Sequence, residues 1–155
     1  MSKPKGPVWV TAQPPLPVLH AVNRVMRPVL ASPLGNRIRG VMLLEFAGRR
    51  SGRTIRVPVN YYAVDGAPAA FTDAPWALNF AGGAPVTVRH QGRVRRGTGT
   101  LVTSPEEVGR GARKAMDNGA PPRRLGLGVA KGHDPSASEL AALGPQLGSM
   151  VRFQL

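Results

Sequence analysis

The segment with the clearest chemical potential is a short basic stretch at residues 48–53, Gly-Arg-Arg-Ser-Gly-Arg. Glycine permits positive φ and close backbone approach, so successive N–H groups can form an anion-binding nest. Arginine adds bidentate contacts to phosphate or carboxylate. The stretch is not a Walker loop, because its spacing is one residue short and arginine replaces the lysine. It therefore predicts an anion-binding turn between two strands, and a solvated basic hairpin is the alternative that the residues alone leave open.

A second candidate element follows Pro75, where the sequence Trp76-Ala77-Leu78-Asn79 reads as the start of a short helix. Residues three apart on a helix lie on one face, so Trp76 and Asn79 are expected to face the same way. They could flank a ligand together. The alternative is structural, with the tryptophan filling the core and the asparagine capping a turn.

Other kinds of site find no support in the sequence. The chain has no cysteine, which excludes a disulfide scaffold, a cysteine-ligated metal and a cysteine nucleophile. Its three histidines, His20, His90 and His133, are far apart and lack a metal-ligand spacing. We therefore expect no metal. Gly126-x-Gly128 lacks the preceding strand and third glycine of a dinucleotide fingerprint.

The elements that must position these residues begin with a proline-rich stretch, residues 1–15, which reads as an extended arm. Residues 16–155 are expected to form a single domain. Its first element is an amphipathic helix over about residues 18–30, where apolar residues recur at helical spacing until Pro28 kinks or ends it. A helix packed across a barrel and a helix resting on an anionic membrane are both compatible with this pattern.

The middle of the chain predicts antiparallel strands. The expected strands are Val41–Ala47, Thr54–Val64, Ala69–Thr72, Pro85–Gln91 and Val94–Thr103. Asp65-Gly66 is a strong hairpin signal, and Val86 and Val88 should share one face.

The last third predicts a helix from Ser104-Pro105 to about Asp117, with serine as N-cap. Residues 121–135 read as irregular, 138–143 as a short helix and Met150–Leu155 as a closing strand. Together these elements predict an α+β fold built on an antiparallel barrel.

Composition and charge narrow the class of protein. The 155 residues fit one domain, and 42% hydrophobic with 19% charged residues is typical of a folded protein. No apolar run reaches the roughly 18 residues needed to span a bilayer, and the N-terminus lacks the apolar core of a signal peptide, so a cytoplasmic protein is expected. The formal net charge of +13 suggests an anionic partner, although coding bias toward arginine also explains an excess of this kind.

The motifs in this order resemble the deazaflavin-dependent nitroreductase family, which are split β-barrel oxidoreductases that use coenzyme F420. The resemblance covers about residues 20–105 and, more weakly, Val151–Leu155. The matching motifs are residues 48–52 between two strands, Pro58, Asp65-Gly66, Trp76-x-x-Asn79 and the Gly-Ala-Pro-Val-Thr-Val of residues 83–88.

The resemblance implies a fold, a cofactor site and a reaction. The fold would be a split barrel with an N-terminal helix and short helices packed on it. The implied reaction is hydride transfer from reduced F420 to a small electron-poor or quinone-like acceptor, and the cofactor carries the difficult chemistry. The cofactor-binding residues that carry over are Arg49, Arg50, Ser51 and Gly52 at the anionic tail, Arg56, then Pro58, Val59 and Asn60 along the ring edge, and Trp76 and Asn79 beside it.

No catalytic residue is assigned. Tyr61 and Tyr62 are the candidates for donating a proton to the acceptor, and strand alternation lets only one of them point inward. Two other functions stay open. One is a split-barrel protein that binds FMN or another anionic ligand without reductase activity. The other is a basic binder of nucleic acid or a membrane surface, although no specific nucleic-acid motif is present and aromatic residues amount to only 5%. A monomer and a homodimer are both compatible with the sequence, as is peripheral membrane contact through the N-terminal helix.

Overall fold

The computed structural model describes residues 8–10, 40–125 and 127–155. A seven-stranded antiparallel sheet dominates them, with the strand order β3-β2-β6-β7-β9-β5-β4. Its strands are β2 (Val41–Ala47), β3 (Thr54–Asn60), β4 (Tyr62–Val64), β5 (Ala67–Thr72), β6 (Ala84–His90), β7 (Arg93–Val102) and β9 (Ser149–Gln154).

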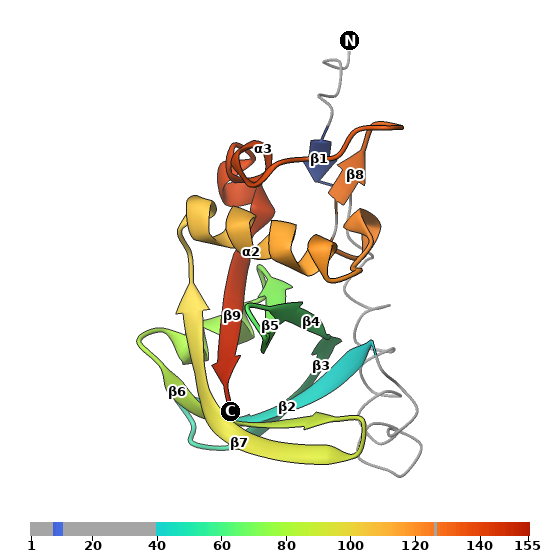
Figure 1. The fold of residues 1–155 in the computed structure, drawn as a ribbon. Coiled ribbons are helices and arrows are strands. Elements are labelled where there is room, and N and C mark those ends of the chain that lie inside the picture. The colour runs from blue at the N-terminus through green and yellow to red at the C-terminus, as the bar shows by residue number, and fades with distance from the viewer. Residues whose placement is uncertain (1–7, 11–39, 126) are drawn as a thin grey trace, which may run out of the picture.

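The sheet is strongly curled (Figure 1). β3 and β4 are separated by Tyr61 alone, yet they form the two opposite edges of the sheet. The curl therefore turns the sheet into a half-barrel, which fits the expected split-barrel type of fold. With the helices packed on it, the fold is α+β, as the sequence predicted.

One strand prediction was wrong in its extent, because residues 54–64 form two strands rather than one. At Tyr61 the chain turns a corner, and its backbone N–H donates to the carbonyl of Gly40 at 2.8 Å. The alternation also changes phase there. Val57 is buried inside the half-barrel, whereas Tyr62 and Val64 are buried in a different cluster that includes Val108. A run of β-forming residues without glycine or proline at the corner gave no sign of this break.

The hairpin prediction at Asp65-Gly66 was confirmed. Asp65 and Gly66 both have positive φ, 53° and 76°, in the tight turn between β4 and β5. Gln91 and Gly92, at 51° and 76°, make the equivalent turn between β6 and β7. Positive φ at both central residues is the geometry that matches the twist of paired strands.

The core inside the half-barrel is made by residues that alternate along the strands. Val86 and Val88 are both buried and share a face, as predicted. Phe80 is fully buried and lies edge-on to Phe46 and Phe153, at ring-centre distances of 4.8 and 5.9 Å. Phe80 belongs to η2 (Pro75–Phe80), a 3₁₀ helix at the place where a short helix was expected.

The helix α2 (Pro105–Asp117) packs on the outside of the sheet, with Val108 and Ala115 buried against Tyr62 and Met150. Ser104 is its N-cap by backbone conformation, although its side chain makes no capping hydrogen bond. Gly109 allows close approach to α3 (Ala137–Ala141), since a Cβ there would lie 2.9 Å from the carbonyl oxygen of Ala137. The expected helix over residues 138–143 is thus present but shorter.

The segment 121–135, expected to be irregular, contains two further elements. These are η3 (Pro122–Leu125) and the short strand β8 (Leu127–Val129), which pairs with β1 (Val8–Val10) from the proline-rich stretch. Between α3 and β9, η4 (Gly144–Leu147) completes the fold. A three-residue strand carries too little periodicity to be predicted. The helix expected at residues 18–30 lies outside the described residues.

Candidate functional site

The basic turn at residues 48–53 is a closed loop between β2 and β3. The N–H of Gly48 donates to the carbonyl of Arg53, and the N–H of Gly52 donates to the carbonyl of Gly48, each at 2.8 Å. The φ of Gly52 is 69°, a conformation that glycine adopts readily. The N–H of Arg53 donates to Ser51 Oγ at 3.2 Å. These bonds close the loop and engage three of its amide groups.

Four of the main-chain N–H groups of residues 48–53 are therefore not free to bind a ligand. The N–H groups of Gly48, Arg49, Gly52 and Arg53 are all engaged in hydrogen bonds within the protein. The guanidinium groups, in contrast, are exposed. The side chains of Arg49, Arg50 and Arg53 are thus available for anion binding.

Asn79 joins the two elements that the sequence singled out separately. Its Oδ1 accepts a hydrogen bond from the N–H of Arg49 at 2.8 Å, and its Nδ2 donates to the carbonyl of Trp76 at 2.7 Å. One asparagine side chain thus fixes η2 to the basic turn, 30 residues away in sequence. The structure thus brings these two motifs together.

Trp76 has a different role from Asn79. It is partly buried and packs against the barrel core, with its ring 6.1 Å from Phe46 and 6.1 Å from Phe80. In a 3₁₀ helix residues three apart are aligned, so the indole and the amide come from one side of η2, where the barrel meets the basic turn.

The expected ring-edge residues divide between the two faces of β3. Val59 pairs with Met42 and packs against the inner core. Arg56, Pro58 and Asn60 alternate with it and lie on the other face. Among the described residues, β3 is a sheet edge that pairs only with β2, so no described strand pairs with its other side.

Arg56 belongs to a charge cluster that the sequence did not reveal. Its guanidinium lies 3.7 Å from the carboxylate of Glu45, and Arg89 bonds the same carboxylate at 2.7 Å. The glutamate side chain is only 15% exposed. The cluster depends on the register of β2 with β3 and β6, which residue spacing within one strand does not report.

A shallow cavity of about 340 Å³ lies beside the basic turn. Ala47 and Thr54, the residues that flank the turn, form one end of it, and Arg96 lines it from β7. The full lining is Glu45, Phe46, Ala47, Thr54, Pro85, Val86, Thr87, Arg96 and Gly97. The lining combines apolar and polar groups with one cation, Arg96, and one carboxylate, Glu45.

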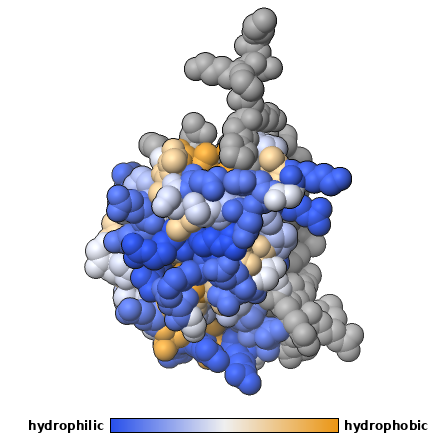
Figure 2. Space-filling model, turned by 45° about the horizontal axis from the view of Figure 1, so that its top comes forward, coloured by the Kyte–Doolittle hydropathy of each residue, from blue (hydrophilic) through white to orange (hydrophobic). Residues whose placement is uncertain are grey.

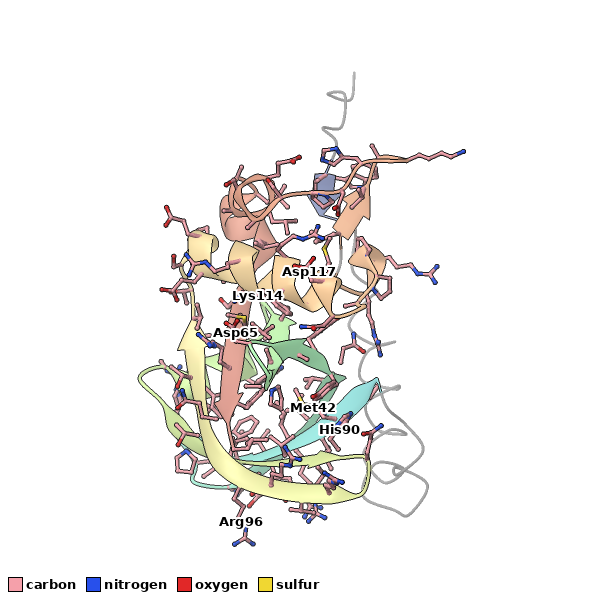
Figure 3. All side chains as sticks on the ribbon, in the orientation of Figure 1. Met42, Asp65, His90, Arg96, Lys114 and Asp117 are labelled. Carbon is pink, nitrogen blue, oxygen red and sulfur yellow. The ribbon has the colours of Figure 1, made fainter. Side chains whose placement is uncertain are left out.

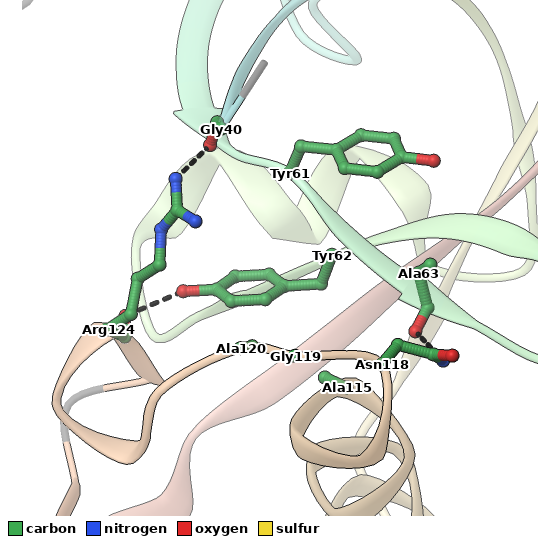
Figure 4. Close-up of a pocket in the computed structure, with 9 residues that line it drawn as sticks. All are labelled: Gly40, Tyr61, Tyr62, Ala63, Ala115, Asn118, Gly119, Ala120 and Arg124. Carbon is green, nitrogen blue, oxygen red and sulfur yellow. Dashed lines mark hydrogen bonds between the residues drawn. The ribbon is translucent and has the colours of Figure 1, made fainter.

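Tyr61 and Tyr62 lie at the other end of β3, about 20 Å along the strand from the basic turn. They line a second cavity of about 240 Å³, bounded by the end of α2 and by Arg124 (Figure 4). Arg124 spans one side of it by donating from Nη2 to the carbonyl of Gly40 at 2.7 Å. The structure therefore brings the candidate tyrosines together with Arg124, and not with the basic turn.

The two tyrosines differ in their availability for proton transfer. The Tyr62 hydroxyl donates to the carbonyl of Arg124 at 2.6 Å, and burial raises its pKa, although Asn60 and Arg124 partly oppose the rise. Its proton is thus held by the main chain. Tyr61 stacks flat on His90, with ring centres 3.9 Å apart. Of the two, Tyr61 is the better placed to meet a ligand.

Within the residues that the structure describes, no group of three or more His, Cys, Asp or Glu side chains could hold a metal ion. His133 pairs with Glu139 at 2.6 Å, and this pair lies beside α3 rather than in either cavity. No helix among the described residues is long and apolar enough to cross a membrane.

Comparison with known proteins identifies no family for this chain. No family model matches the chain, and no curated protein matches it significantly. A solved structure with a similar chain path is that of the conserved hypothetical protein Rv2991 from Mycobacterium tuberculosis, at 16% identity and a TM-score of 0.46. The match covers 76% of this chain and 73% of that one.

Proposed function

We propose that this protein is a deazaflavin-dependent oxidoreductase that passes a hydride from reduced F420 to a small electron-poor or quinone-like acceptor. The observation that carries the proposal is the hydrogen bond between Arg49 N–H and Asn79 Oδ1. It joins the two motifs on which the family resemblance rests, the basic turn and the Trp-x-x-Asn helix.

The side chains at the turn suit the anionic end of such a cofactor. Arg49, Arg50 and Arg53 are exposed, and none of them forms an ion pair with another described residue. Guanidinium groups bind phosphate and carboxylate bidentately. We therefore assign the phosphate and carboxylates of the tail to Arg49 and Arg50, with Ser51 beside them.

The other residues that we assign to the cofactor lie on β3 and η2. No other described strand pairs with the edge of β3 opposite β2. At Pro58, Val59 and Asn60 this edge would offer main-chain groups to the ring, and Trp76 would exclude water from one side. When bound, the deazaflavin supplies the hydride. The Tyr61 hydroxyl is the candidate for delivering a proton to the reduced acceptor, because the proton of Tyr62 is already donated to Arg124.

A titration separates this function from the alternatives. The full chain is titrated with F420, with FMN and with a short DNA duplex, and the same is done for Arg49→Ala/Arg50→Ala. A matched control is Arg110→Ala/Arg123→Ala, which removes two exposed arginines elsewhere. We expect F420 binding that weakens at least about tenfold in the turn variant and is unchanged in the control.

Binding of FMN without F420 would favour an anionic-ligand protein that lacks the proposed activity. Equal loss of F420 binding in both double variants would also refute the assignment, because the effect would then be one of net charge. If F420 binds as expected, oxidation of the reduced cofactor by a soluble quinone tests the hydride transfer itself.

A further inference from the structure

The cavity of about 240 Å³ between Tyr61, Tyr62 and the end of α2 contains a cation that no described acid neutralises. We call it the Arg124 cavity. Arg124 takes part in none of the ion pairs among the described residues. None of the described residues that line the cavity is acidic, and Asp117, at the same end of α2, is bonded by Arg113 at 2.6 Å. The cavity therefore has one uncompensated positive charge.

The main chain of Arg124 is fixed at both of its polar groups. Its N–H donates to the carbonyl of Pro121 at 3.0 Å, and its carbonyl accepts from the Tyr62 hydroxyl at 2.6 Å. The side chain then extends along one side of the cavity to the carbonyl of Gly40, at 2.7 Å (Figure 4). A Cβ at residue 40 would overlap the guanidinium, so glycine is what permits this path. The fold thus positions the cation at the cavity.

The guanidinium of Arg124 has hydrogen-bonding capacity left for a ligand. A guanidinium has five N–H donors, and among the described residues this one donates only to the neutral carbonyl of Gly40. A hydrogen bond to a carboxylate is charge-assisted, roughly twice as strong, and can be bidentate. A phosphate carries up to about two negative charges at neutral pH, whereas the described lining has a single cation. A carboxylate is therefore the better match.

The rest of the lining favours a small flat group attached to that carboxylate. The ring of Tyr62 forms one wall, and three alanines and two glycines keep the other walls low (Figure 4). The carbonyls at the end of α2, which would repel an anion, are engaged by the N–H groups of residues 118–120. A volume of about 240 Å³ is below the range of roughly 300–1,000 Å³ that is usual for drug-sized ligands. The ligand is therefore about the size of one aromatic ring.

The Arg124 cavity is separate from the residues assigned to F420, none of which lines it. Figure 3 shows His90 within the curl of the sheet and Asp117 on α2. The cavity lies between them, since Tyr61 stacks on His90 and Asn118 follows Asp117. The face turned forward in Figure 2 is mostly hydrophilic, so polarity alone does not mark a site. The unneutralised, positioned cation is what distinguishes this cavity.

We propose that the Arg124 cavity binds a small aromatic carboxylate, with the guanidinium of Arg124 on the carboxylate and the ligand ring against Tyr62. Binding of this kind does not require F420. Because Tyr61 also lines the cavity and is the proton donor assigned above, the acceptor of the proposed reaction would be a carboxylate of this class. That extension alone rests on the proposed function.

The test is an NMR titration of the full chain with benzoate, with benzamide as the uncharged analogue, and with acetate and inorganic phosphate as anions without a ring. Benzoate should shift the amides of Ala63 and Gly119, which line the cavity, and bind at least about tenfold more tightly than the other three probes. Arg124→Ala should weaken benzoate binding at least about tenfold. Arg123→Ala is the matched control, because it removes the same charge from the exposed neighbouring residue, outside the cavity.

Arg124→Lys keeps the charge but loses the planar fork, so its affinity for benzoate should lie between those of the wild type and Arg124→Ala. Equal losses in Arg123→Ala and Arg124→Ala would overturn the proposal, because the effect would then be one of net charge. Binding of benzamide, acetate or phosphate as tight as that of benzoate would overturn it as well. F420 binding should be unchanged in Arg124→Ala, and benzoate binding unchanged in Arg49→Ala/Arg50→Ala, so failure of this proposal and failure of the proposed function are distinguishable.

Discussion

The link between η2 and the basic turn can be tested by replacing Asn79 with alanine. This change removes the acceptor for the N–H of Arg49 and the donor to the carbonyl of Trp76, bonds of 2.8 and 2.7 Å. A hydrogen bond in a folded protein contributes about 0.5–1.5 kcal/mol net. The Arg49 bond is exposed and the Trp76 bond is only part-buried, so water replaces them in part. We expect the free energy of unfolding to fall by about 1–2 kcal/mol.

Urea denaturation measures this loss, and amide hydrogen exchange locates it. In Asn79→Ala the amide of Arg49 should exchange faster, while amides in the centre of β2 should keep their protection. Asn79→Asp retains an oxygen acceptor for Arg49 but loses the NH₂ donor. It should therefore restore the protection of Arg49 and recover part of the stability.

Asn118→Ala is the matched control. Asn118 Nδ2 donates one hydrogen bond, 2.9 Å, to the carbonyl of Ala63, far from the basic turn. The Asn118→Ala variant should lose about 1 kcal/mol of unfolding free energy without any change in the hydrogen exchange of the Arg49 amide. Unchanged stability and unchanged Arg49 exchange in Asn79→Ala would refute the view that this side chain holds the two motifs together.

Three further predictions concern the scaffold. Gly97→Ala should destabilise the protein by about 1–3 kcal/mol or more in urea unfolding, because the added Cβ would collide with the main-chain oxygen of Gln154 in β9. The control is Thr98→Ala at the exposed neighbouring position, which should change stability by no more than about 0.5 kcal/mol. Tyr62→Phe should lower the free energy of unfolding by about 1 kcal/mol, because it removes the hydrogen bond to the carbonyl of Arg124. Since the pKa of Tyr62 is raised above 10.0, the contribution of this tyrosine to stability should be present below pH 10.0 and lost as pH rises through the folded-state pKa. A Tyr62 phenol that titrates at or below 10.0 by ultraviolet absorbance would contradict this. Glu139→Gln should lower the urea midpoint at neutral pH, because His133, and then the Ser136 backbone, hold the pKa of Glu139 below its ordinary 4.5. The contribution of the Glu139 carboxylate to stability is present above pH 4.5 and is lost as pH falls through the folded-state pKa. A difference in midpoint between Glu139→Gln and the wild type that persists at low pH would refute this.

Sequence patterns predicted the local elements well, because they depend on neighbours in the chain. The strand Val41–Ala47 and the positive-φ turn at Asp65-Gly66 are set by β-propensity and turn chemistry. Pro75 fixed the start of η2 in the same way. Each of these signals lies within a few residues of the element that it predicts.

What the sequence did not show depends on register and on the curl of the sheet. The sharing of Glu45 by Arg56 and Arg89 requires three strands in one alignment. The corner at Tyr61 and the pairing of β1 with β8 are also long-range, and neither has a local turn residue or enough length to mark it. For the candidate site, the sequence indicated which kinds of residue could bind an anionic ligand. It did not indicate the hydrogen bond from the Arg49 N–H to Asn79 Oδ1, or the position of the tyrosines at the far end of β3.

The position of β9 inside the sheet, between β7 and β5, has a consequence for the order of folding. β2–β3, β6–β7 and β4–β5 are hairpins of adjacent segments, whereas β9 pairs with β7 on one side and β5 on the other. It bridges segments that lie about 50 and 80 residues earlier in the chain. A nascent chain can therefore form its hairpins early, but its sheet stays in two pieces until residues 149–154 have left the ribosome. A shortened chain that ends before Ser149 should accumulate as a partly ordered species with unpaired edges on β5 and β7, the form most exposed to self-association.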